Sequence, residues 1–251
     1  METITAVIIT CNEERNIGRC LESLKGVADR VVVVDSGSTD TTADICQQHG
    51  AQFVSHAWEG YSLQKNYANS LVTDGWILSL DADEALSDTL RSNLLNLKKQ
   101  GLDKGAVYAL RRLNNCCGQW IRHSGWAPDI KVRLWPAGTA SWDGVVHEEL
   151  RFTGTPRTII LSGELLHYSY YSIAELADRQ VAYARLAAQK AHERGRHCSL
   201  LGLWLRPGWT FMRNYLLRGG FRDGQMGYIV CRMSAFYTFT KYAELLMKNE
   251  E

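Results

Sequence analysis

Two aspartates, Asp81 and Asp83, are separated by one residue and follow a short apolar segment at 76–80. Residues two positions apart in an extended chain project to the same side, so both carboxylates can face one point. Two like charges this close repel each other unless a cation, a shared proton or solvent compensates them. Oxygen ligands suit a hard ion such as Mg²⁺ or Mn²⁺, which typically bridges protein carboxylates to substrate phosphates. We therefore predict a metal site at this pair, with a solvated acidic turn as the alternative.

Two other polar turns also come directly after predicted strands. One covers residues 10–14 and contains Asn12 and Glu13, and the other covers residues 35–40 and begins and ends with an aspartate. Each turn alone is consistent with helix capping, because Asn12 and Asp40 occupy positions where N-cap residues belong. The carboxyl ends of parallel strands lie at one edge of a sheet, however, and ligands bind there in α/β proteins. Three acid-bearing turns at one edge therefore predict a binding site.

The first hundred residues alternate predicted strands with predicted amphipathic helices. The strands are expected at 4–10, 30–35, 51–55 and 76–80, and the helices at 16–25, 40–49, 62–70 and 87–99. Four consecutive valines at 31–34 are typical of a parallel strand that is buried on both faces. This alternation predicts an α/β fold with a doubly wound, mostly parallel sheet.

Beyond about residue 105 the pattern changes. Short strands are expected at 108–112, 119–123, 131–135 and 145–152, and helices at 172–194, 208–217 and 224–247. The first of these helices opens with a capping box, in which Ser172 precedes Glu175 by three residues. We therefore predict two domains. Residues 1–168 form a catalytic domain, and residues 169–251 form a helical extension that is rich in aromatic residues and arginine.

The composition of the 251 residues is that of a soluble globular protein, with 45% apolar and 22% charged residues. A formal net charge of +1 argues against a general nucleic-acid binder, which needs a basic excess. The seven cysteines form no C-x-x-C pair, so we expect neither a zinc cage nor a disulfide framework, and a reducing cytoplasm is the simplest compartment. The first residues lack the basic region of a signal peptide, and no apolar run approaches the roughly 18–20 residues of a spanning helix.

Eight segments, taken together, resemble one protein family. Four of them are similar to the nucleotide-sugar domain of family 2 glycosyltransferases: Thr10-x-Asn12-Glu13, residues 34–40, Gln64-Lys65-Asn66 and residues 80–84. The other four are similar to a narrower subgroup, the bacterial lipopolysaccharide-core glycosyltransferases of the β-glucosyltransferase type: residues 122–126, 133–135, 142–148 and 166–168. The resemblance spans nearly the whole chain. It implies the GT-A fold of this family and transfer of a sugar from a nucleotide-sugar donor.

The resemblance implies roles for individual residues. In the family, the aspartate that matches Asp35 accepts hydrogen bonds from the nucleotide base, and the residue that matches Asp83 binds the metal. The positions that it implies for donor binding are Thr10, Asn12, Glu13, Asp35, Ser36, Lys65 and Asp81. Asp81 also matches a position that faces the ribose or the metal, and His167 matches a histidine that completes the metal site. The alternative for His167 is a histidine with satisfied hydrogen bonds in the core.

Several arginines are candidates for contacts with the donor diphosphate or with an acceptor phosphate. They are Arg111, which we include among the donor-binding residues, and Arg112, Arg122 and Arg133. Because arginine is abundant in the chain, the sequence does not separate them further.

Sugar transfer with inversion requires a base that deprotonates the acceptor hydroxyl as it attacks the anomeric carbon, and a cation that holds the leaving diphosphate. GT-A enzymes usually carry an acidic residue in a second motif after the paired aspartates, and Glu148 is the best match to it. Asp143 is the second candidate, because it follows Trp142, an aromatic side chain able to stack on a sugar ring. Glu149 lies on the opposite face of a strand from Glu148, so the two do not both point inward. The expected cofactor is a divalent metal ion, Mg²⁺ or Mn²⁺.

The near-neutral charge of the chain conceals a local imbalance. Residues 194–232 carry seven arginines and one aspartate, a net charge of +6, which leaves −5 for the rest of the chain. Ten of the 25 aromatic residues lie between positions 204 and 242. This segment is consistent with the core of a helical subdomain, with a dimer interface, or with a surface that docks on anionic lipid. Because the resembling enzymes use lipid-anchored acceptors, we favour the anionic membrane surface.

The sequence therefore predicts an inverting, metal-dependent glycosyltransferase that moves a hexose from a nucleotide diphosphate sugar to a lipid-linked saccharide acceptor. Among the possible donors, we expect a UDP-sugar. The acceptor is a lipopolysaccharide core or a related glycolipid, and a capsular or exopolysaccharide precursor or a peptide is the alternative. We expect a cytoplasmic protein, peripheral on the inner face of the cytoplasmic membrane, with no nucleic-acid partner. A sugar nucleotidyltransferase normally has a glycine-rich, basic loop after its first strand, where this chain has Thr10-Cys11-Asn12-Glu13. A non-enzymatic scaffold is disfavoured because Asp81, Asp83, Glu148 and His167 are all present.

Overall fold

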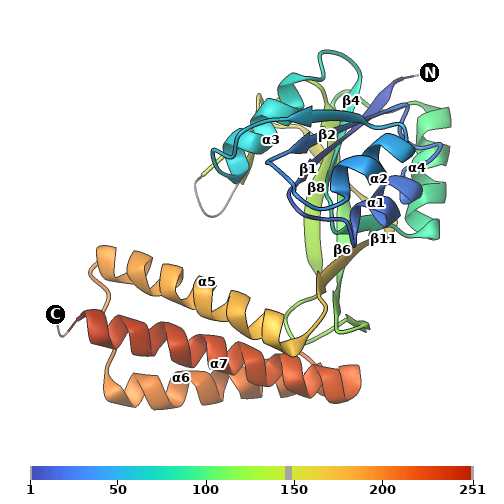
Figure 1. Ribbon diagram of the computed structural model, residues 1–251. Coiled ribbons are helices and arrows are strands. Elements are labelled where there is room, and N and C mark those ends of the chain that lie inside the picture. The colour runs from blue at the N-terminus through green and yellow to red at the C-terminus, as the bar shows by residue number, and fades with distance from the viewer. Residues whose placement is uncertain (1, 145–148, 250–251) are drawn as a thin grey trace. The chain divides into compact units, whose positions relative to one another are not determined.

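The computed structural model describes residues 2–144 and 149–249 (Figure 1). The chain forms two compact units, here called unit 1 and unit 2. Unit 1 comprises Met1–Arg112 and Asp129–His167, and unit 2 comprises Leu113–Pro128 and Tyr168–Glu251. Strands β6 (Ala106–Cys116) and β11 (Arg157–Tyr170) contribute residues to both units. The predicted division into two domains at residue 168 stays a prediction.

Unit 1 begins with the predicted alternation of strands and helices, which is confirmed. Its first elements are β1 (Ile4–Thr10), α1 (Ile17–Ser23), β2 (Arg30–Asp35), α2 (Thr42–Gln48), β3 (Gln52–Ser55), α3 (Tyr61–Ser70), β4 (Trp76–Asp81), β5 (Glu84–Leu86) and α4 (Asp88–Gln100). The later strands β8 (Asp129–Pro136), β9 (Ala140–Asp143) and β10 (Glu149–Phe152) complete it. Strands β5 and β11 are not predicted from the sequence. The first has only three residues, and Ser162, Gly163 and Glu164 interrupt the apolar pattern of the second.

The main sheet has the strand order β3-β2-β1-β4-β8-β6-β11-β5, and β7 (Gln119–Ile121) pairs with β6. Strands β3, β2, β1 and β4 are parallel, as predicted for the first half of the chain, and antiparallel strands extend the sheet beyond β4. The chain moves outward from β1 to β3 and then returns to the other side of β1 as β4. This reversal is the point at which open α/β sheets form a crevice at the carboxyl ends of their strands. Thr10, Asp35 and Asp81 are the last residues of the three central strands at that point.

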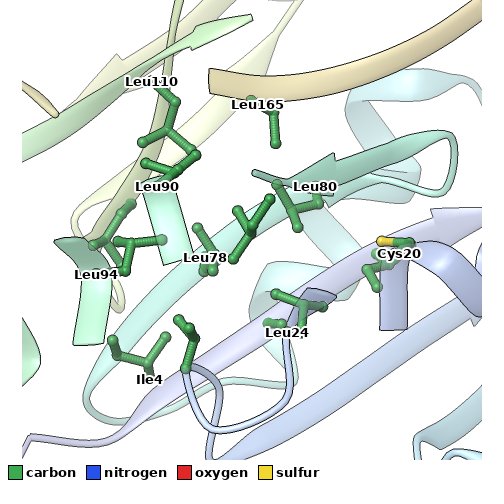
Figure 2. Packing of buried hydrophobic residues seen from close by; sticks show 14 of the residues in the cluster. Ile4, Cys20, Leu24, Leu78, Leu80, Leu90, Leu94, Leu110 and Leu165 are labelled. Atoms are coloured by element: carbon green, nitrogen blue, oxygen red, sulfur yellow. The ribbon is translucent and has the colours of Figure 1, made fainter. Parts of the chain in front are cut away.

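The core of unit 1 lies on both faces of the sheet, because successive residues of a strand point to opposite sides. On β1, Ile8 joins the cluster that contains residues of α1, α2 and α4, whereas Val7 joins the cluster that contains α3. In the first cluster, Leu78 of β4 packs with Leu90 and Leu94 of α4 (Figure 2). Helices therefore cover both faces, and the predicted doubly wound arrangement is confirmed.

Gly163 allows β11 to lie against the first turn of α4. It has a φ of +96°, and a Cβ at this position would lie only 2.4 Å from the backbone nitrogen of Leu90. Beside it, the Glu164 N–H donates to Ser87 Oγ, and the Ser87 N–H donates to the Glu164 carbonyl, both at 3.0 Å. Ser87 is also the N-cap of α4 and accepts the Leu90 N–H. The glycine therefore permits the close approach, and the two hydrogen bonds hold β11, which carries His167, against α4.

Unit 2 consists mainly of helices. They are α5 (Ile173–Glu193), α6 (Leu200–Met212), a π-helical turn (Arg213–Leu217), a 3₁₀ turn (Gly220–Asp223) and α7 (Gly224–Lys248). The predicted cap of α5 is confirmed, because Ser172 Oγ accepts the Glu175 N–H at 3.1 Å. Helix α6 begins eight residues before the predicted start at 208, because Ser199 caps it and the helix continues through Pro207. None of the described helices is both long enough and apolar enough to cross a bilayer.

Asp223 anchors the segment 122–126 of unit 2, one of the segments that carry the family resemblance. Its carboxylate, whose side chain is 5% exposed, accepts the backbone N–H groups of Arg122 at 3.2 Å and His123 at 2.9 Å. It also lies 2.8 Å from Nδ1 of His123. The segment is therefore held to the start of α7 by a single buried carboxylate.

We expect Gly163→Ala to destabilise the protein, because the added Cβ would overlap the backbone of Leu90. The unfolding free energy should fall by more than about 1 kcal/mol in urea denaturation followed by circular dichroism. Gly101→Ala is the matched control. Gly101 has the same φ of +96°, but a Cβ there meets no atom within 4 Å among the described residues. Equal losses in the two variants would contradict the steric explanation.

Candidate active site

The loops after β1 and β2 are joined by hydrogen bonds. Asn12 has a left-handed backbone with a φ of +55°, its N–H donates to Ser38 Oγ, and its Oδ1 accepts the Thr39 N–H, both at 2.8 Å. The Glu13 N–H donates to Thr42 Oγ1 at 2.9 Å. These bonds hold two of the three predicted turns against each other at the carboxyl edge of the sheet. Asn12 and Glu13 therefore build the edge, and their contact with a donor stays a prediction.

Asp35 ends β2 and is 3% exposed, and its carboxylate folds back onto its own turn. Its Oδ2 accepts the N–H groups of Gly37 and Ser38 at 2.8 Å each, and its Oδ1 accepts the Ser38 hydroxyl. The Ser36 N–H donates to the carbonyl of Thr10 at 3.0 Å. The structure thus brings Thr10, Asp35 and Ser36 together at adjacent strand ends. The carboxylate is held by its own turn, and its predicted contact with a base stays a prediction.

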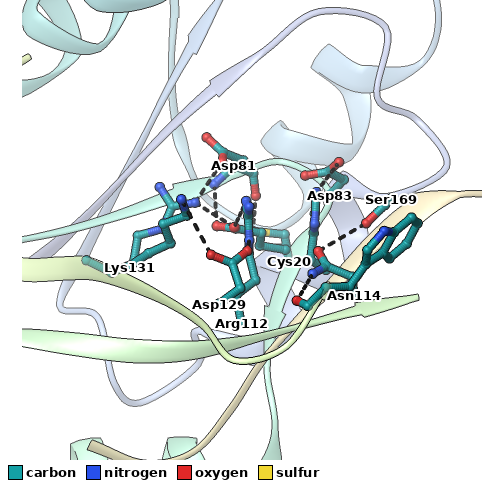
Figure 3. Close-up of polar contacts among 12 residues, drawn as sticks. Cys20, Asp81, Asp83, Arg112, Asn114, Asp129, Lys131 and Ser169 are labelled. Carbon is teal, nitrogen blue, oxygen red and sulfur yellow. Dashed lines mark hydrogen bonds and ion pairs between the residues drawn. The ribbon is translucent and has the colours of Figure 1, made fainter. Parts of the chain in front are cut away.

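A buried arginine from β8 holds the acidic turn after β4. Arg133 is 3% exposed, and its Nη2 contacts the carboxylates of Asp81, at 2.7 Å, and Glu84. Glu84, only 1% exposed, also accepts the Asp81 N–H at 3.0 Å and lies 3.4 Å from Arg112. Arg112 in turn pairs with Asp129 at 2.7 Å (Figure 3). Positive and negative charges therefore alternate through the cluster, and each buried charge has a partner of opposite sign.

Asp81 has a cation beside each of its carboxylate oxygens. Lys65 Nζ lies 3.1 Å from Oδ1, and Arg133 Nη2 lies 2.7 Å from Oδ2. Burial by itself raises the pKa of Asp81, but the charges of Arg133 and Lys65 outweigh burial and hold this pKa well below its usual range. For Arg133, burial lowers the pKa, but Asp81 and Glu84 more than offset this effect and raise it. Asp81 therefore stays ionised, and its predicted contact with a ribose or a metal stays a prediction.

Asp83 and His167 are brought together by the pairing of β5 with β11. In this ladder His167 lies opposite Glu84, the residue after Asp83. His167 Nε2 is 3.1 Å from Oδ2 of Asp83, and both side chains are 16% exposed. This contact is a hydrogen bond between the two side chains. The distance also equals the roughly 3.0 Å between two ligands at right angles on an ion with bonds of about 2.1 Å, so the predicted metal-binding roles of Asp83 and His167 stay predictions. No cluster of three metal-ligating side chains occurs in the described part of the chain, so substrate and water would complete such a site.

Three consecutive residues of α3 contact three different parts of the site. Gln64 is fully buried and donates from Nε2 to Ser36 Oγ at 3.2 Å, at the end of β2. Lys65 contacts the acidic turn through Asp81, as described above. Asn66 binds the backbone of Trp142 in β9, where Oδ1 accepts the N–H and Nδ2 donates to the carbonyl, both at 2.8 Å. Helix α3 therefore connects the β2 loop, the acidic turn and β9.

Strand β9 leads into the segment that contains the predicted base. Asp143 ends β9, its side chain is 58% exposed, and it pairs with Arg151 of β10 at 2.9 Å. Its other oxygen accepts the Gly144 N–H at 2.8 Å. Glu148, the preferred base, lies outside the described residues, and Glu149 begins β10 opposite Asp143. Both oxygens of Asp143 already have partners within this hairpin, and the roles of Asp143 and Glu148 stay predictions.

The arginines that the sequence offers as phosphate contacts lie in different surroundings. Arg111 is exposed on β6, and the adjacent Arg112 contacts the acidic turn instead. Arg133 is buried between two carboxylates. The sequence indicated no role for Glu84, although three acids within four residues require cations nearby. That excess of negative charge was the signal that could have pointed to Arg133 as their structural partner.

A family model described as glycosyl transferase family 2 matches residues 5–160. An uncharacterized glycosyltransferase of Rickettsia felis is 32% identical over 263 residues, which cover 98% of this chain and 90% of that protein. The lipopolysaccharide core biosynthesis glycosyltransferase LpsC of Rhizobium meliloti is 30% identical over 256 residues, which cover 98% of this chain and 93% of that protein. The chain therefore belongs to glycosyltransferase family 2, and the predicted enzyme class is confirmed.

Solved structures of glucosyl-3-phosphoglycerate synthase from Mycobacterium tuberculosis are also similar to parts of this chain. The complex with Mn²⁺, uridine diphosphate and glucosyl-3-phosphoglycerate aligns over 45% of this chain and 44% of that chain, with a TM-score of 0.36 and 22% identity.

We expect Asp81→Asn to lower stability at neutral pH, because it leaves Arg133 and Lys65 with less negative charge beside them. The loss should be on the order of 2 kcal/mol at pH 7. Because the pKa of Asp81 is lowered in the folded state, its contribution is complete above about pH 4 and is lost as the pH falls towards the folded pKa. The difference between wild type and variant in urea unfolding should therefore narrow below about pH 4.

Asp74→Asn is the control for this titration, because Asp74 pairs with Arg30 at 2.8 Å and both side chains are more than half exposed. Such a surface pair contributes little to stability. A difference between wild type and Asp81→Asn that stays constant from neutral to acid pH would contradict the assigned charge interaction.

Proposed function

We propose that this glycosyltransferase moves a hexose, with inversion at the anomeric carbon, from a nucleotide diphosphate sugar to a lipopolysaccharide core or a related glycolipid. The observation that carries the proposal is the approach of Asp83 to His167 at the carboxyl edge of the parallel strands. A carboxylate and an imidazole at this edge form the protein part of a site for a divalent ion and a diphosphate. A UDP-sugar is the first donor to test.

The donor is proposed to lie across the ends of β1, β2 and β4. Thr10, Asn12, Glu13, Asp35 and Ser36 surround its nucleoside, and Lys65, Asp81 and Arg111 are on the side of its ribose and diphosphate. Lys65 supports this arrangement because it is held by Asp81 at 3.1 Å and lies 4.7 Å from the centre of the Trp142 ring. A compact ammonium fixed in this way can contact a phosphate without losing much side-chain freedom.

Asp83 and His167, with Asp81 beside them, are the residues proposed to hold a divalent ion, Mg²⁺ or Mn²⁺. When bound, such an ion stabilises the negative charge of the leaving diphosphate. Asp83 supplies the anionic oxygen that a hard cation prefers, and His167 supplies a neutral nitrogen. Because Arg133 and Lys65 already pair with Asp81, Asp83 is the first member of this group to test.

The acceptor hydroxyl is proposed to lose its proton to Glu148, with Asp143 as the second candidate. The ion pair of Asp143 with Arg151 supports this order, because accepting a proton would require Asp143 to give up a charged partner at 2.9 Å. Asn66 supports either candidate as a positioning residue, since it holds the backbone of Trp142 directly before Asp143.

A lipid-linked acceptor is supported by similarity to LpsC along nearly the whole chain. Such an acceptor requires the enzyme to work at a membrane surface, and the proposed place is the inner face of the cytoplasmic membrane, with peripheral attachment. The arginine-rich segment of unit 2 supports attachment to an anionic surface, because each basic residue near such a surface contributes about 1 kcal/mol.

Donor binding is expected to depend on metal. A panel of nucleotide sugars, each with and without Mn²⁺ or Mg²⁺, should raise the thermal unfolding midpoint most for the true donor with metal. Saturation at about 100 times the dissociation constant corresponds to about 2.7 kcal/mol of stabilisation. Asp83→Asn and His167→Asn should lose the metal-dependent part, whereas Asp74→Asn should keep it. Metal-independent stabilisation by every active nucleotide sugar would refute the proposed metal site.

The proton acceptor is tested by comparing three neighbouring acids. Glu148→Gln should lower the transfer rate by about 10²–10⁴-fold, measured as release of nucleoside diphosphate with an isolated core glycolipid, while donor affinity stays unchanged. Glu149→Gln is the matched control and should keep most of the rate, because Glu149 is exposed and is not one of the two candidate bases. If Asp143→Asn loses the rate and Glu148→Gln keeps it, the base is Asp143. If a capsular precursor or a peptide is glycosylated in place of the core glycolipid, the proposed acceptor is wrong.

A further inference from the structure

An apolar stripe runs along one side of α6 and the π-helical turn that follows it. Its eight side chains are exposed by 47% to 81% of their area: Leu200, Leu201, Trp204, Leu205, Trp209, Met212, Leu216 and Leu217. Neighbouring members are one, three or four residues apart, and the steps of three and four follow the turn of a helix, so that the set covers a broad side of it. We call this set the α6 stripe. A continuous apolar surface of this kind marks an interaction site, whereas single exposed apolar residues do not.

The opposite side of α6 is already filled by its own unit. Leu203 packs in a cluster with Leu245 of α7 and Ala188 of α5. Thr210 and Thr238 are joined by a hydrogen bond between their hydroxyl groups at 3.2 Å. Leu203 and Thr210 therefore pack α6 against the rest of unit 2, while the eight residues of the α6 stripe keep about half or more of their area exposed.

The charged residues around the α6 stripe have one sign. Six arginines lie in the same segment of the sequence, at positions 194, 196, 206, 213, 218 and 222, and all of them except the half-buried Arg213 are exposed. The sequence has no aspartate or glutamate between residues 194 and 222. The next acid, Asp223, has a side chain that is 5% exposed and accepts hydrogen bonds from Arg122 and His123. It does not neutralise the surface, so the occupant of the stripe must combine an apolar interior with negative charge at its boundary.

We propose that the α6 stripe inserts into the boundary between headgroups and acyl chains of an anionic lipid surface, with the arginines on the headgroups. A helix of 13 residues is about 20 Å long, which is less than the roughly 30 Å of the hydrocarbon core, so α6 lies in the plane of the surface. The indoles of Trp204 and Trp209 suit this depth, because tryptophan concentrates at membrane interfaces. The inference deepens the proposed function, on which its biological setting rests, by assigning the membrane contact to one helix face.

A second copy of the chain is a poorer occupant. A two-fold contact through the α6 stripe would place the same surface on both partners, so the arginines of one copy would face those of the other. Without acids in the stripe, this repulsion would have no compensation. Anionic headgroups instead supply the negative charge that the arginines lack.

The test uses the full chain and vesicles of phosphatidylcholine, with or without phosphatidylglycerol. Wild type should float with the vesicles that contain phosphatidylglycerol and much less with phosphatidylcholine alone. The double variant L205E/W209E should bind about tenfold more weakly or worse, because it removes apolar area and adds negative charge. Leu186→Glu is the control, since Leu186 is also exposed, by 42%, but lies on α5. Its binding should match that of wild type.

A second measurement does not depend on a disruptive substitution. Lipids with brominated acyl chains should quench tryptophan fluorescence of wild type, and Trp204→Phe, which keeps an apolar aromatic side chain, should lose a large part of that quenching. Absence of flotation, equal binding by L205E/W209E and wild type, or unchanged quenching in Trp204→Phe would each overturn the proposal. A dimer that forms without lipid and that L205E/W209E converts to monomers would also overturn the proposal, because the α6 stripe would then join two copies of the chain.

The outcome is separable from that of the proposed function. None of the substituted residues lies at the candidate donor or metal site, so L205E/W209E should keep the metal-dependent stabilisation by nucleotide sugar. Flotation of wild type without any donor binding would retain the membrane surface and reject the proposed donor chemistry. Donor binding without flotation would retain the proposed donor chemistry and reject the membrane surface.

Discussion

The acidic edge of the sheet depends on the pairing of Arg133 with Asp81 and Glu84. Removing one partner of a buried ion pair lowers stability strongly, because the remaining charge is desolvated and has no partner of opposite sign. Glu84 is almost fully buried, and its carboxylate is tolerated because Arg133 and Arg112 lie beside it. With Asp81 and Glu84 engaged in this way, Asp83 is the carboxylate of the turn that faces a histidine.

The same pairing reaches the rest of the site through Lys65. Its contact with Asp81 ties α3 to the acidic turn, and the residues on either side of Lys65 extend the connection in two directions. Gln64 reaches the loop after β2, and Asn66 reaches the backbone of β9. Because consecutive residues of a helix point about 100° apart, one turn of α3 can contact three separate segments. The acidic turn, the loop after β2 and strand β9 are therefore joined through one turn of α3 by contacts shorter than 3.5 Å.

Local pattern predicted the parallel half of the fold and the turns at its edge. The valines of β2 and the cap at Ser172 are signals within a few residues, and the structure confirms the elements that they indicate. Strands β5 and β11 were not predicted, because their pairing brings together residues about 80 positions apart in the sequence. The burial of Arg133 depends on such long-range contacts as well, and periodicity along the chain carries no information about them. The start of α6 was missed because Pro207 and Gly208, usually found near helix ends, lie inside it.

The number of residues between Gly163 and His167 on β11 cannot change without moving the imidazole. Gly163 is fixed against α4, and His167 is fixed opposite Glu84 in the ladder with β5. Side chains alternate between the faces of a strand, so one residue inserted between these two points would turn the imidazole to the wrong side of the sheet. The turn at 153–156, before β11, is held neither against α4 nor in the ladder with β5, so residues can be inserted there without turning the imidazole. Among related chains, differences in length are therefore expected in that turn and not among the three residues between the glycine and the histidine.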